Sequence, residues 1–416
     1  MSVRHTVARV DLNAIEANFR AVSSFVANPA VPRSEPASAS PASRVAHPAS
    51  RIIAVVKANA YGHGAVPVGL ALERAGAAML ACADIEEGVV LRRGGVRIPI
   101  LVFGALGISD LDGVFEYGLT PTISTPSAAR ALAAKMRSVP NSRFPRANWG
   151  QTPNVPSGAP VGVRPRSLGY HLKIDTGMNR LGFRHDNLDR TLPEIAAFED
   201  LQIEGVYTHF ATADDPESPQ FQPQRERFEQ VLLRIHALGL KPRYRHAANS
   251  AALLRDERTW YDFVRPGLLL YGVVPPPLAS TLPLRPALSL HSRIVHVKGV
   301  RAGEATGYGL KTPFAEPATI AVVPAGYADG LDRRLAGNGY MLVRGRRAAI
   351  VGSVCMDMTM IDVTGMDVTP GDEVVIVGNQ DDESIGVREV AAAIGTIPYE
   401  LLCRVGTRIE RVYETG

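Results

Sequence analysis

Short apolar runs alternate with helical patterns through the first two thirds of the chain. The runs are rich in β-branched residues and end at turn or charged residues, which is typical of buried parallel strands. Between two of them, "DIEEGVVLRRGG" opens on Asp84 with Glu87 three residues later, a capping-box pattern at the start of a helix. An open doubly wound sheet is disfavoured because no run leads into a G-x-G-x-x-G turn. Eight runs separated by helices therefore predict a (β/α)8 TIM-type barrel over residues 11–283. The runs are Ile52–Lys57, Met79–Ala83, Ile98–Phe103, Leu119–Ser124, Gly169–Asp175, Gln202–His209, Tyr244–Ala247 and Asp262–Arg265.

The pattern changes near Pro286, where alternating segments such as "ATIAVV" and "MTMIDV" begin. They predict a mainly antiparallel β domain over residues 284–416, to which residues 5–11 would add a strand. Two stretches, 28–50 and 138–167, are dominated by Pro, Ala, Ser, Gly and Asn. Such composition buries too little apolar surface to offset chain ordering, so we expect mobile insertions in the barrel.

Composition narrows the class of protein. The formal charge is +4 without a dense Lys/Arg cluster, which argues against nucleic-acid binding. No 18-residue apolar run or signal-peptide pattern occurs, so we expect no membrane span and a cytoplasmic protein. Cys82, Cys355 and Cys403 are widely spaced and form no C-x-x-C motif, which indicates reduced thiols and no metal site.

Polar residues collect where the predicted strands end. They are Lys57, Lys173, Asp175, His209, Asn249, Ser250 and Arg265. In a barrel the carboxyl ends of the strands meet at one face, where functional groups gather. A single lysine at such a position is commonly a solvated strand end. Lys57, however, is followed by a small-residue loop with Tyr61 and His63, and a desolvated lysine there has a lowered pKa and can form a Schiff base.

The loops after the last two strands suggest a phosphate site. Asn249 and Ser250 stand at a predicted helix start, and Gly267 follows Arg265. Loops at these places bind phosphate in many barrels, although an ordinary helix cap explains Ser250 equally well. A Schiff-base lysine beside a phosphate site points to pyridoxal 5′-phosphate as cofactor.

These motifs resemble those of a known family. "AVVKANAYGHGA" is similar to the pyridoxal-phosphate lysine signature of alanine racemases, and the likeness continues through "LKIDTGMNRLGF", "HAANSAALL", "VRPGLLLYG" and "GSVCMDMTMIDV". It covers nearly the whole chain except the two insertions. The resemblance implies a barrel followed by a β domain, and an isomerase that interconverts L-alanine and D-alanine and supplies D-alanine for peptidoglycan.

The resemblance also implies roles for single residues. Lys57 would carry the cofactor and act as one base, and Tyr308 would be the second base on the opposite face of the substrate. Arg180 and His209 would favour the tyrosinate, and Arg180 would bind the substrate carboxylate. Arg265 would face the pyridine nitrogen, which stays unprotonated because a guanidinium only donates. The residues matching cofactor-binding positions are Tyr61, Asn249, Ser250, Gly267, Leu268 and Tyr399.

Three further residues match family positions that involve either a modified lysine or a contribution from the other subunit. Lys173 aligns with a lysine that is carbamylated in some members, and a plain ion pair with Asp175 is the alternative. Met356 and Asp357 match substrate-pocket residues that the β domain of the other subunit contributes, as it does Tyr308. The resemblance thus implies a C2 homodimer with two shared sites. Other functions left open are a serine or broad-specificity racemase, an amino-acid decarboxylase of related build, and a non-catalytic pyridoxal-phosphate binding protein.

Overall fold

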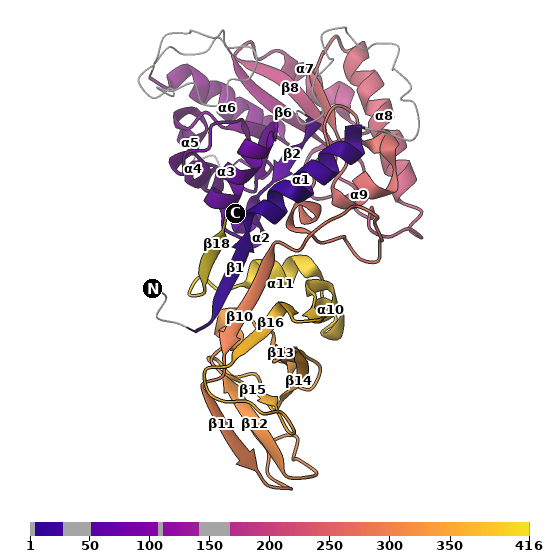
Figure 1. The fold of residues 1–416 in the computed structure, drawn as a ribbon. Helices are drawn as coiled ribbons and strands as arrows, with labels where there is room; N and C mark the ends of the chain where they lie inside the picture. Colours follow the sequence, from indigo (N-terminus) through magenta and orange to yellow (C-terminus); the bar gives the residue numbers. More distant parts are fainter. Residues whose placement is uncertain (1–4, 28–50, 107–110, 141–166, 416) are drawn as a thin grey trace.

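The computed structural model describes residues 5–27, 51–106, 111–140 and 167–415. The predicted insertion 28–50 and nearly all of 138–167 lie outside these residues. The described chain forms a barrel, at the top of Figure 1, and a second, mostly antiparallel sheet below it. The division of the chain at residue 283 stays a prediction.

Seven parallel strands form the wall of the barrel, in the order β2-β3-β4-β5-β6-β8-β9. The eighth predicted run closes the wall through isolated bridges, with Phe263 paired to His246 of β9 and Val264 paired to Ile52 before β2. Val264 accepts a hydrogen bond from Ile53 N at 2.9 Å and donates one to Arg51 O at 3.0 Å. The predicted barrel is therefore confirmed. The strands are β2 Ile53–Val55, β3 Met79–Cys82, β4 Ile100–Val102, β5 Thr120–Ile123, β6 Leu168–Asp175, β8 Leu201–Tyr207 and β9 Tyr244–His246, and β7 Phe183–Arg184 pairs with β6.

Helices surround these strands, and most strands of the barrel lead into a helix before the next strand begins (Figure 1). The capping box predicted one start correctly, because Asp84 accepts a hydrogen bond from Glu87 N at 2.8 Å at the start of α4. The helices are α1 Leu12–Ala27, α2 Lys57–Tyr61, α3 Ala65–Ala75, α4 Ile85–Arg93, α5 Asp112–Glu116, α6 Pro126–Ser138, α7 Leu188–Ala196, α8 Phe221–Ala237 and α9 Ser250–Arg255, with the 3-10 turns η5 Glu257–Thr259 and η6 Leu268–Tyr271.

The start of the chain belongs to the second sheet, whose order is β11-β12-β15-β14-β13-β16-β10-β1-β18. Strand β1 (Val7–Asp11) pairs antiparallel with β10 and parallel with β18, so residues from both chain ends lie side by side. The other strands are β10 Leu288–Arg293, β11 His296–Val300, β12 Ala318–Val323, β13 Tyr340–Val343, β14 Arg346–Val351, β15 Thr359–Asp362, β16 Glu373–Gln380, β17 Glu383–Ile385 and β18 Glu410–Glu414. They are joined by η7 Tyr327–Asp329, η8 Arg333–Leu335, α10 Val387–Ala393 and α11 Pro398–Arg404.

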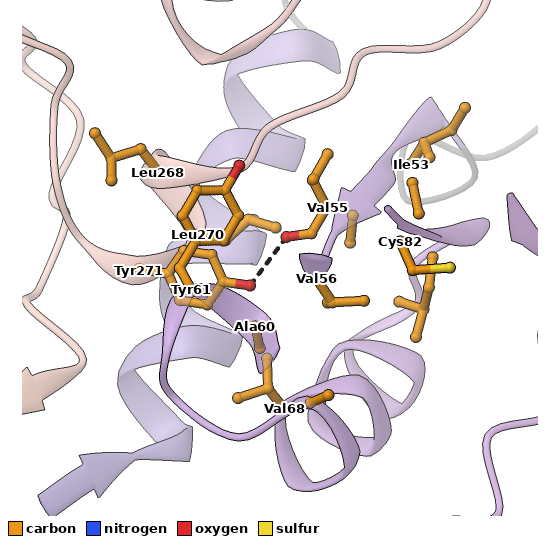
Figure 2. Packing of buried hydrophobic residues seen from close by; sticks show 14 of the residues in the cluster. Ile53, Val55, Val56, Ala60, Tyr61, Val68, Cys82, Leu268, Leu270 and Tyr271 are labelled. Carbon is orange, nitrogen blue, oxygen red and sulfur yellow. Dashed lines mark hydrogen bonds between the residues drawn. The ribbon is translucent and has the colours of Figure 1, made fainter. Parts of the chain in front are cut away.

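One apolar core runs from the barrel into the second sheet. Figure 2 shows its part beneath β2, where Tyr271 OH donates a hydrogen bond to Val55 O at 2.9 Å. The ring of Tyr61 packs on Tyr271 with centroids 4.9 Å apart, and on Tyr399 of α11 at 5.8 Å. Because α11 comes from the far end of the chain, this packing ties the second sheet to the loop that follows β2.

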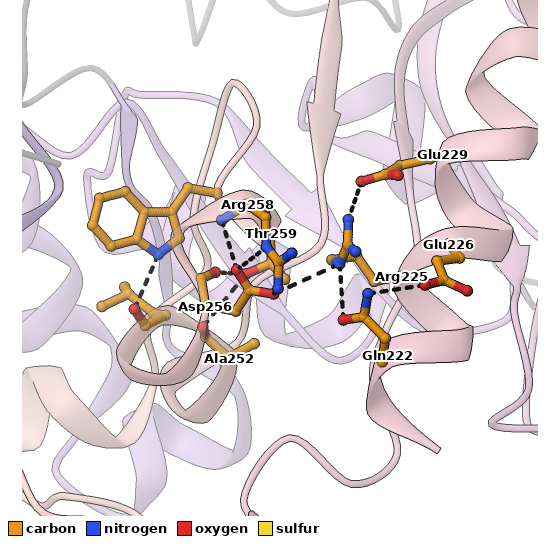
Figure 3. Close-up of polar contacts among 10 residues, drawn as sticks. Gln222, Arg225, Glu226, Glu229, Ala252, Asp256, Arg258 and Thr259 are labelled. Atoms are coloured by element: carbon orange, nitrogen blue, oxygen red, sulfur yellow. Dashed lines mark hydrogen bonds and ion pairs between the residues drawn. The ribbon is translucent and has the colours of Figure 1, made fainter. Parts of the chain in front are cut away.

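A polar network outside the core joins α8 to η5 (Figure 3). Asp256 accepts hydrogen bonds from Arg258 at 2.9 and 3.0 Å, and its carboxylate lies 3.6 Å from Arg225 of α8. Arg225 is itself buried and also pairs with Glu229. Asp256 therefore fixes the segment that leads from α9 toward the eighth barrel position.

Among the described helices, none is long and apolar enough to cross a bilayer.

Candidate active site

The backbone after β2 has an uncommon conformation. Ala58, Asn59, Ala60 and Tyr61 all have φ between 52° and 54°, in the left-handed region. Residues other than glycine pay about 1–2 kcal/mol each for this conformation. Four in a row form a left-handed helical turn that begins next to Lys57, and strain of this kind gathers at functional sites.

Two side chains hold this turn in place. Glu87 of α4 accepts a hydrogen bond from Ala58 N at 2.6 Å and another from Ala83 N at 2.7 Å. Asn59 Oδ1 accepts from Ala65 N at 2.7 Å. The sequence pattern predicted only a local cap for Glu87, whereas its carboxylate bridges the ends of β2 and β3.

Tyr61 and His63 both turn inward from this loop. His63 is fully buried, packs at a tilt against Tyr271 with centroids 4.5 Å apart and contacts the carbonyl oxygen of Tyr61 through Nδ1 at 2.9 Å. Burial lowers the pKa of His63 to about 4, so the ring is neutral at pH 7 and its Nδ1–H is the donor. His63 therefore has a structural role, because it holds the turn after Lys57 against the core.

Arg265 is a buried cation whose partners are all neutral. Its guanidinium donates to Thr208 O and Ala247 O, each at 2.8 Å, and lies 2.9 Å from His246 Nδ1 and 3.4 Å from His209 Nδ1. Burial lowers the pKa of Arg265 to about 10. Among the described residues no carboxylate pairs with it, so this end of the site attracts acceptor groups and anions.

Further basic side chains lie near Arg265 at the same mouth of the barrel. Burial lowers the pKa of Lys57, and the charge of Arg180 lowers it further. Burial also puts the pKa of Lys173 well below its usual value, with Arg265 and Arg180 acting in the same direction. For His209, burial and then the charges of these lysines and arginines lower the pKa well below its ordinary range.

Asp175, at the end of β6, is engaged by backbone donors. Its Oδ1 atom accepts hydrogen bonds from Gly177 N at 2.9 Å and Asn179 N at 3.1 Å, and so shapes the loop that leads to Arg180. Lys173 Nζ lies over the ring of Tyr207, 4.6 Å from its centroid. Among the described residues Lys173 and Asp175 form no ion pair within 4.0 Å, although the nearby charge of Asp175 raises the pKa of Lys173 against the effect of burial.

Small and hydroxyl residues gather beside the left-handed turn. Ser250 Oγ accepts a hydrogen bond from Gly267 N at 2.9 Å, and Asn249 caps α9 by accepting from Ala252 N at 2.9 Å. A Cβ atom on residue 267 would lie 2.4 Å from Tyr61 OH, so only glycine fits there. Leu268 follows at the start of η6 and is buried. Among the described residues no cluster of His, Cys, Asp or Glu could hold a metal ion.

Comparison with known proteins agrees with this geometry. Sequence models of the alanine racemase N-terminal domain and of the alanine racemase C-terminal domain match residues 40–275 and 287–413. The chain belongs to the alanine racemase family. It is 38% identical over 413 residues to the alanine racemase of Symbiobacterium thermophilum, covering 99% of this chain and 97% of the relative. It is 41% identical over 372 residues to that of Desulforamulus reducens, covering 88% and 92%.

Solved structures of the alanine racemase family have the same fold. The alanine racemase of Streptomyces lavendulae superposes with a TM-score of 0.85 at 32% identity, covering 100% of this chain and 98% of that chain. The Bacillus anthracis alanine racemase, solved with bound L-Ala-P, gives a TM-score of 0.80 at 34% identity, covering 100% and 96%. Both likenesses extend over the barrel and the second sheet together.

Three predicted residues do not join this cluster within one chain. Tyr308 lies in the loop between β11 and β12, with 75% of its surface exposed, and its carbonyl oxygen accepts a hydrogen bond from Ser353 Oγ at 2.7 Å. Met356 and Asp357 follow β14 and are also exposed. Figure 1 shows β11 and β12 at the end of the molecule farthest from the barrel. The barrel mouth is thus built from residues of the barrel and α11.

Proposed function

We propose that this protein interconverts L-alanine and D-alanine with pyridoxal 5′-phosphate bound at the barrel mouth. The observation that supports this most directly is that Lys57, on its strained turn, and Arg265, a buried cation that lacks a carboxylate partner among the described residues, stand at the same end of the barrel. A positive site of this kind fits a phosphorylated cofactor and an amino-acid carboxylate together.

The residues present fit the cofactor at both of its ends. Tyr61 OH, Ser250 Oγ and the backbone at Gly267 lie together, and the missing Cβ lets this backbone approach a phosphate closely. Asn249, Leu268 and Tyr399 border the same place. Arg265 would donate to the pyridine nitrogen, which can then only accept. When bound, the cofactor would delocalise the electron pair left on Cα after proton loss.

Two bases on opposite faces of the amino acid would move the Cα proton. Desolvation and Arg180 lower the pKa of Lys57, so its amine is more readily available as a base on one face. Tyr308 of the partner subunit would act on the other face, supported by His209, while Arg180 holds the substrate carboxylate. Because racemisation requires a proton to leave one face and return to the other, one chain with Lys57 alone would not complete it.

A C2 homodimer with two shared sites would supply the missing face. Tyr308, Met356 and Asp357 are exposed on the second sheet, as expected for residues that complete a neighbour's site. A tyrosine and a methionine exposed by 75% and 52% are typical of a surface that a partner covers.

Lys173 has the properties of a carbamylated lysine. Its neutral amine, favoured by burial among cations, would bond to the carbon of CO2 and release one proton, which leaves a negative carbamate. This charge would balance Arg265 and orient Arg180. Carbon-13 NMR in labelled bicarbonate should show a carbamate resonance that Lys173→Ala removes, and its absence from the wild-type protein would exclude the modification.

The decisive experiment is proton exchange in D2O. Purified protein with L-alanine should produce D-alanine deuterated at Cα, without pyruvate or loss of CO2. Tyr308→Phe should bind the cofactor normally, as judged by its absorbance, and lose racemisation. Cofactor absorbance without Cα exchange on alanine would refute the proposal. Serine is then the next substrate to test, and a carrier role remains if serine also fails.

A further inference from the structure

The loop that carries Met356 and Asp357 is fixed at its backbone by one turn of the same chain. Tyr327 N donates to Cys355 O at 3.0 Å, and Ala328 N donates to Met356 O at 3.1 Å. A Cβ on residue 326 would lie 2.3 Å from Met356 O, so this approach requires glycine. The exposed side chains of the loop therefore stand on a rigid base.

Arg408 closes this arrangement from the side of β18. It donates to both carboxylate oxygens of Asp329, at 2.8 and 3.0 Å, and it pairs with Asp357 at 2.8 Å. It also lies 3.4 Å from Met356 O. A planar guanidinium can bind all three acceptors at once, whereas one ammonium group cannot match this fork.

The carboxylate of Asp329 anchors the arrangement to the core. It is fully buried, and Oδ2 also accepts a hydrogen bond from Gly326 N at 2.9 Å. Arg408 is held at a set angle by this bidentate contact, and its remaining donor reaches Asp357, whose side chain is 54% exposed. The position of Asp357 thus depends on Arg408, while the position of Arg408 depends on Asp329.

We infer that Arg408 is a positioning residue for the substrate pocket of the partner subunit, acting through the loop 355–358. This inference rests on the proposed function, in which Met356 and Asp357 complete the partner's site. Arg408 also offsets part of the negative charge of Asp357 from within its own chain, since it shares its charge between Asp329 and Asp357. Without that pairing, the charge of Asp357 would stand unpaired in the proposed pocket and would oppose binding of the negative carboxylate of alanine.

Hybrid dimers test the inference, because they separate the two ends of a shared site. One chain carries Lys57→Ala and the other carries Tyr308→Phe, with different affinity tags for purification after co-expression. One of the two sites then has both mutations and the other has none. Arg408→Lys is placed either in the Lys57→Ala chain, whose loop serves the intact site, or in the Tyr308→Phe chain, whose loop serves the dead site.

We expect Arg408→Lys in the Lys57→Ala chain to raise KM for alanine about tenfold, with a smaller effect on kcat, because binding geometry is lost before chemistry. The same substitution in the other chain should leave KM at the value of the unmodified hybrid. Equal changes in both hybrids, or none in either, would overturn the inference and assign Arg408 a purely structural role or none. Arg408→Gln gives the same comparison if the lysine variant does not assemble.

The unmodified hybrid reports on the proposed function separately. With one intact site, it should retain about half of the wild-type kcat per dimer, provided that the sites are shared and independent. Loss of all activity in this hybrid, with an active wild-type dimer, would show that the sites are not shared in this way. That result would reject the shared site itself before Arg408 is considered.

Discussion

Replacing Ala58 by glycine is expected to stabilise this protein, although the same change in an ordinary helix does the opposite. Ala58 is exposed and has φ 52° and ψ 53° in the left-handed turn after Lys57. Relief of that conformation is worth about 1–2 kcal/mol. The extra freedom of glycine in the unfolded chain takes back about 0.4–1 kcal/mol. The expected net gain in the free energy of unfolding lies between about 0 and 1.6 kcal/mol, with a midpoint of about 0.8 kcal/mol.

Urea unfolding followed by circular dichroism measures this gain, at one protein concentration because subunit association contributes to stability. The matched control is Ala134→Gly, at an exposed position inside the right-handed helix α6. That change should cost about 1 kcal/mol. If Ala58→Gly lost as much stability as Ala134→Gly, the left-handed turn would not exist in solution and the strain argument would be refuted.

Three further changes test other parts of the structure. Glu87→Gln should lower kcat and destabilise the fold by about 1–2 kcal/mol, since it weakens two charge-assisted hydrogen bonds near Lys57. An unchanged kcat would show that the left-handed turn does not contribute to catalysis. Because the pKa of His63 is lowered to about 4 from 6.5, the unfolded chain alone binds this proton between those values. Stability should therefore fall as pH drops from 7 to 5, and His63→Asn should remove up to about 1.4 kcal/mol per pH unit of that slope in urea titrations, while an unaltered slope would contradict its neutral state. Asp256→Ala should lower the free energy of unfolding by about 2–3 kcal/mol, because it leaves the buried Arg225 with one fewer partner. The control Asp189→Ala, in an exposed ion pair with Arg234, should lower it by less than about 1 kcal/mol. Equal losses of stability in the two variants would argue against the network in Figure 3.

The strands of the barrel could be predicted because buried parallel strands leave a strong local pattern. Apolar runs such as Ile98–Phe103 fix the element and its burial with little reference to the rest of the chain. The run Asp262–Arg265 gave a weaker signal, and the structure gives the reason: only isolated bridges at Phe263 and Val264 close the wall there. The eighth barrel position is defined by pairing with its neighbours rather than by its own sequence.

The site was predictable as a set of residues but not as a geometry. Strand ends identified Lys57, Lys173, His209 and Arg265, because the barrel topology brings such ends to one face. The left-handed turn was not foreseen, since "ANAY" contains no glycine and each residue alone favours a right-handed conformation. The hydrogen bond from Ala58 N to Glu87, which spans 29 residues, helps to hold this turn and cannot be read from the local sequence.

The histidines behind Arg265 were also missed, and donor–acceptor logic now fixes their protons. Arg265 can only donate, so His246 Nδ1, 2.9 Å away, must be unprotonated, and a neutral His246 carries its proton on Nε2. That nitrogen lies 2.8 Å from His171 Nδ1, which must therefore accept. His171 then carries its proton on Nε2, which is buried without a hydrogen-bond partner among the described residues. Burial lowers the pKa of both rings, and protonating either one would set two donors against each other. The pair thus supplies a neutral acceptor that anchors the Arg265 guanidinium, which the proposed cofactor would meet with an acceptor of its own.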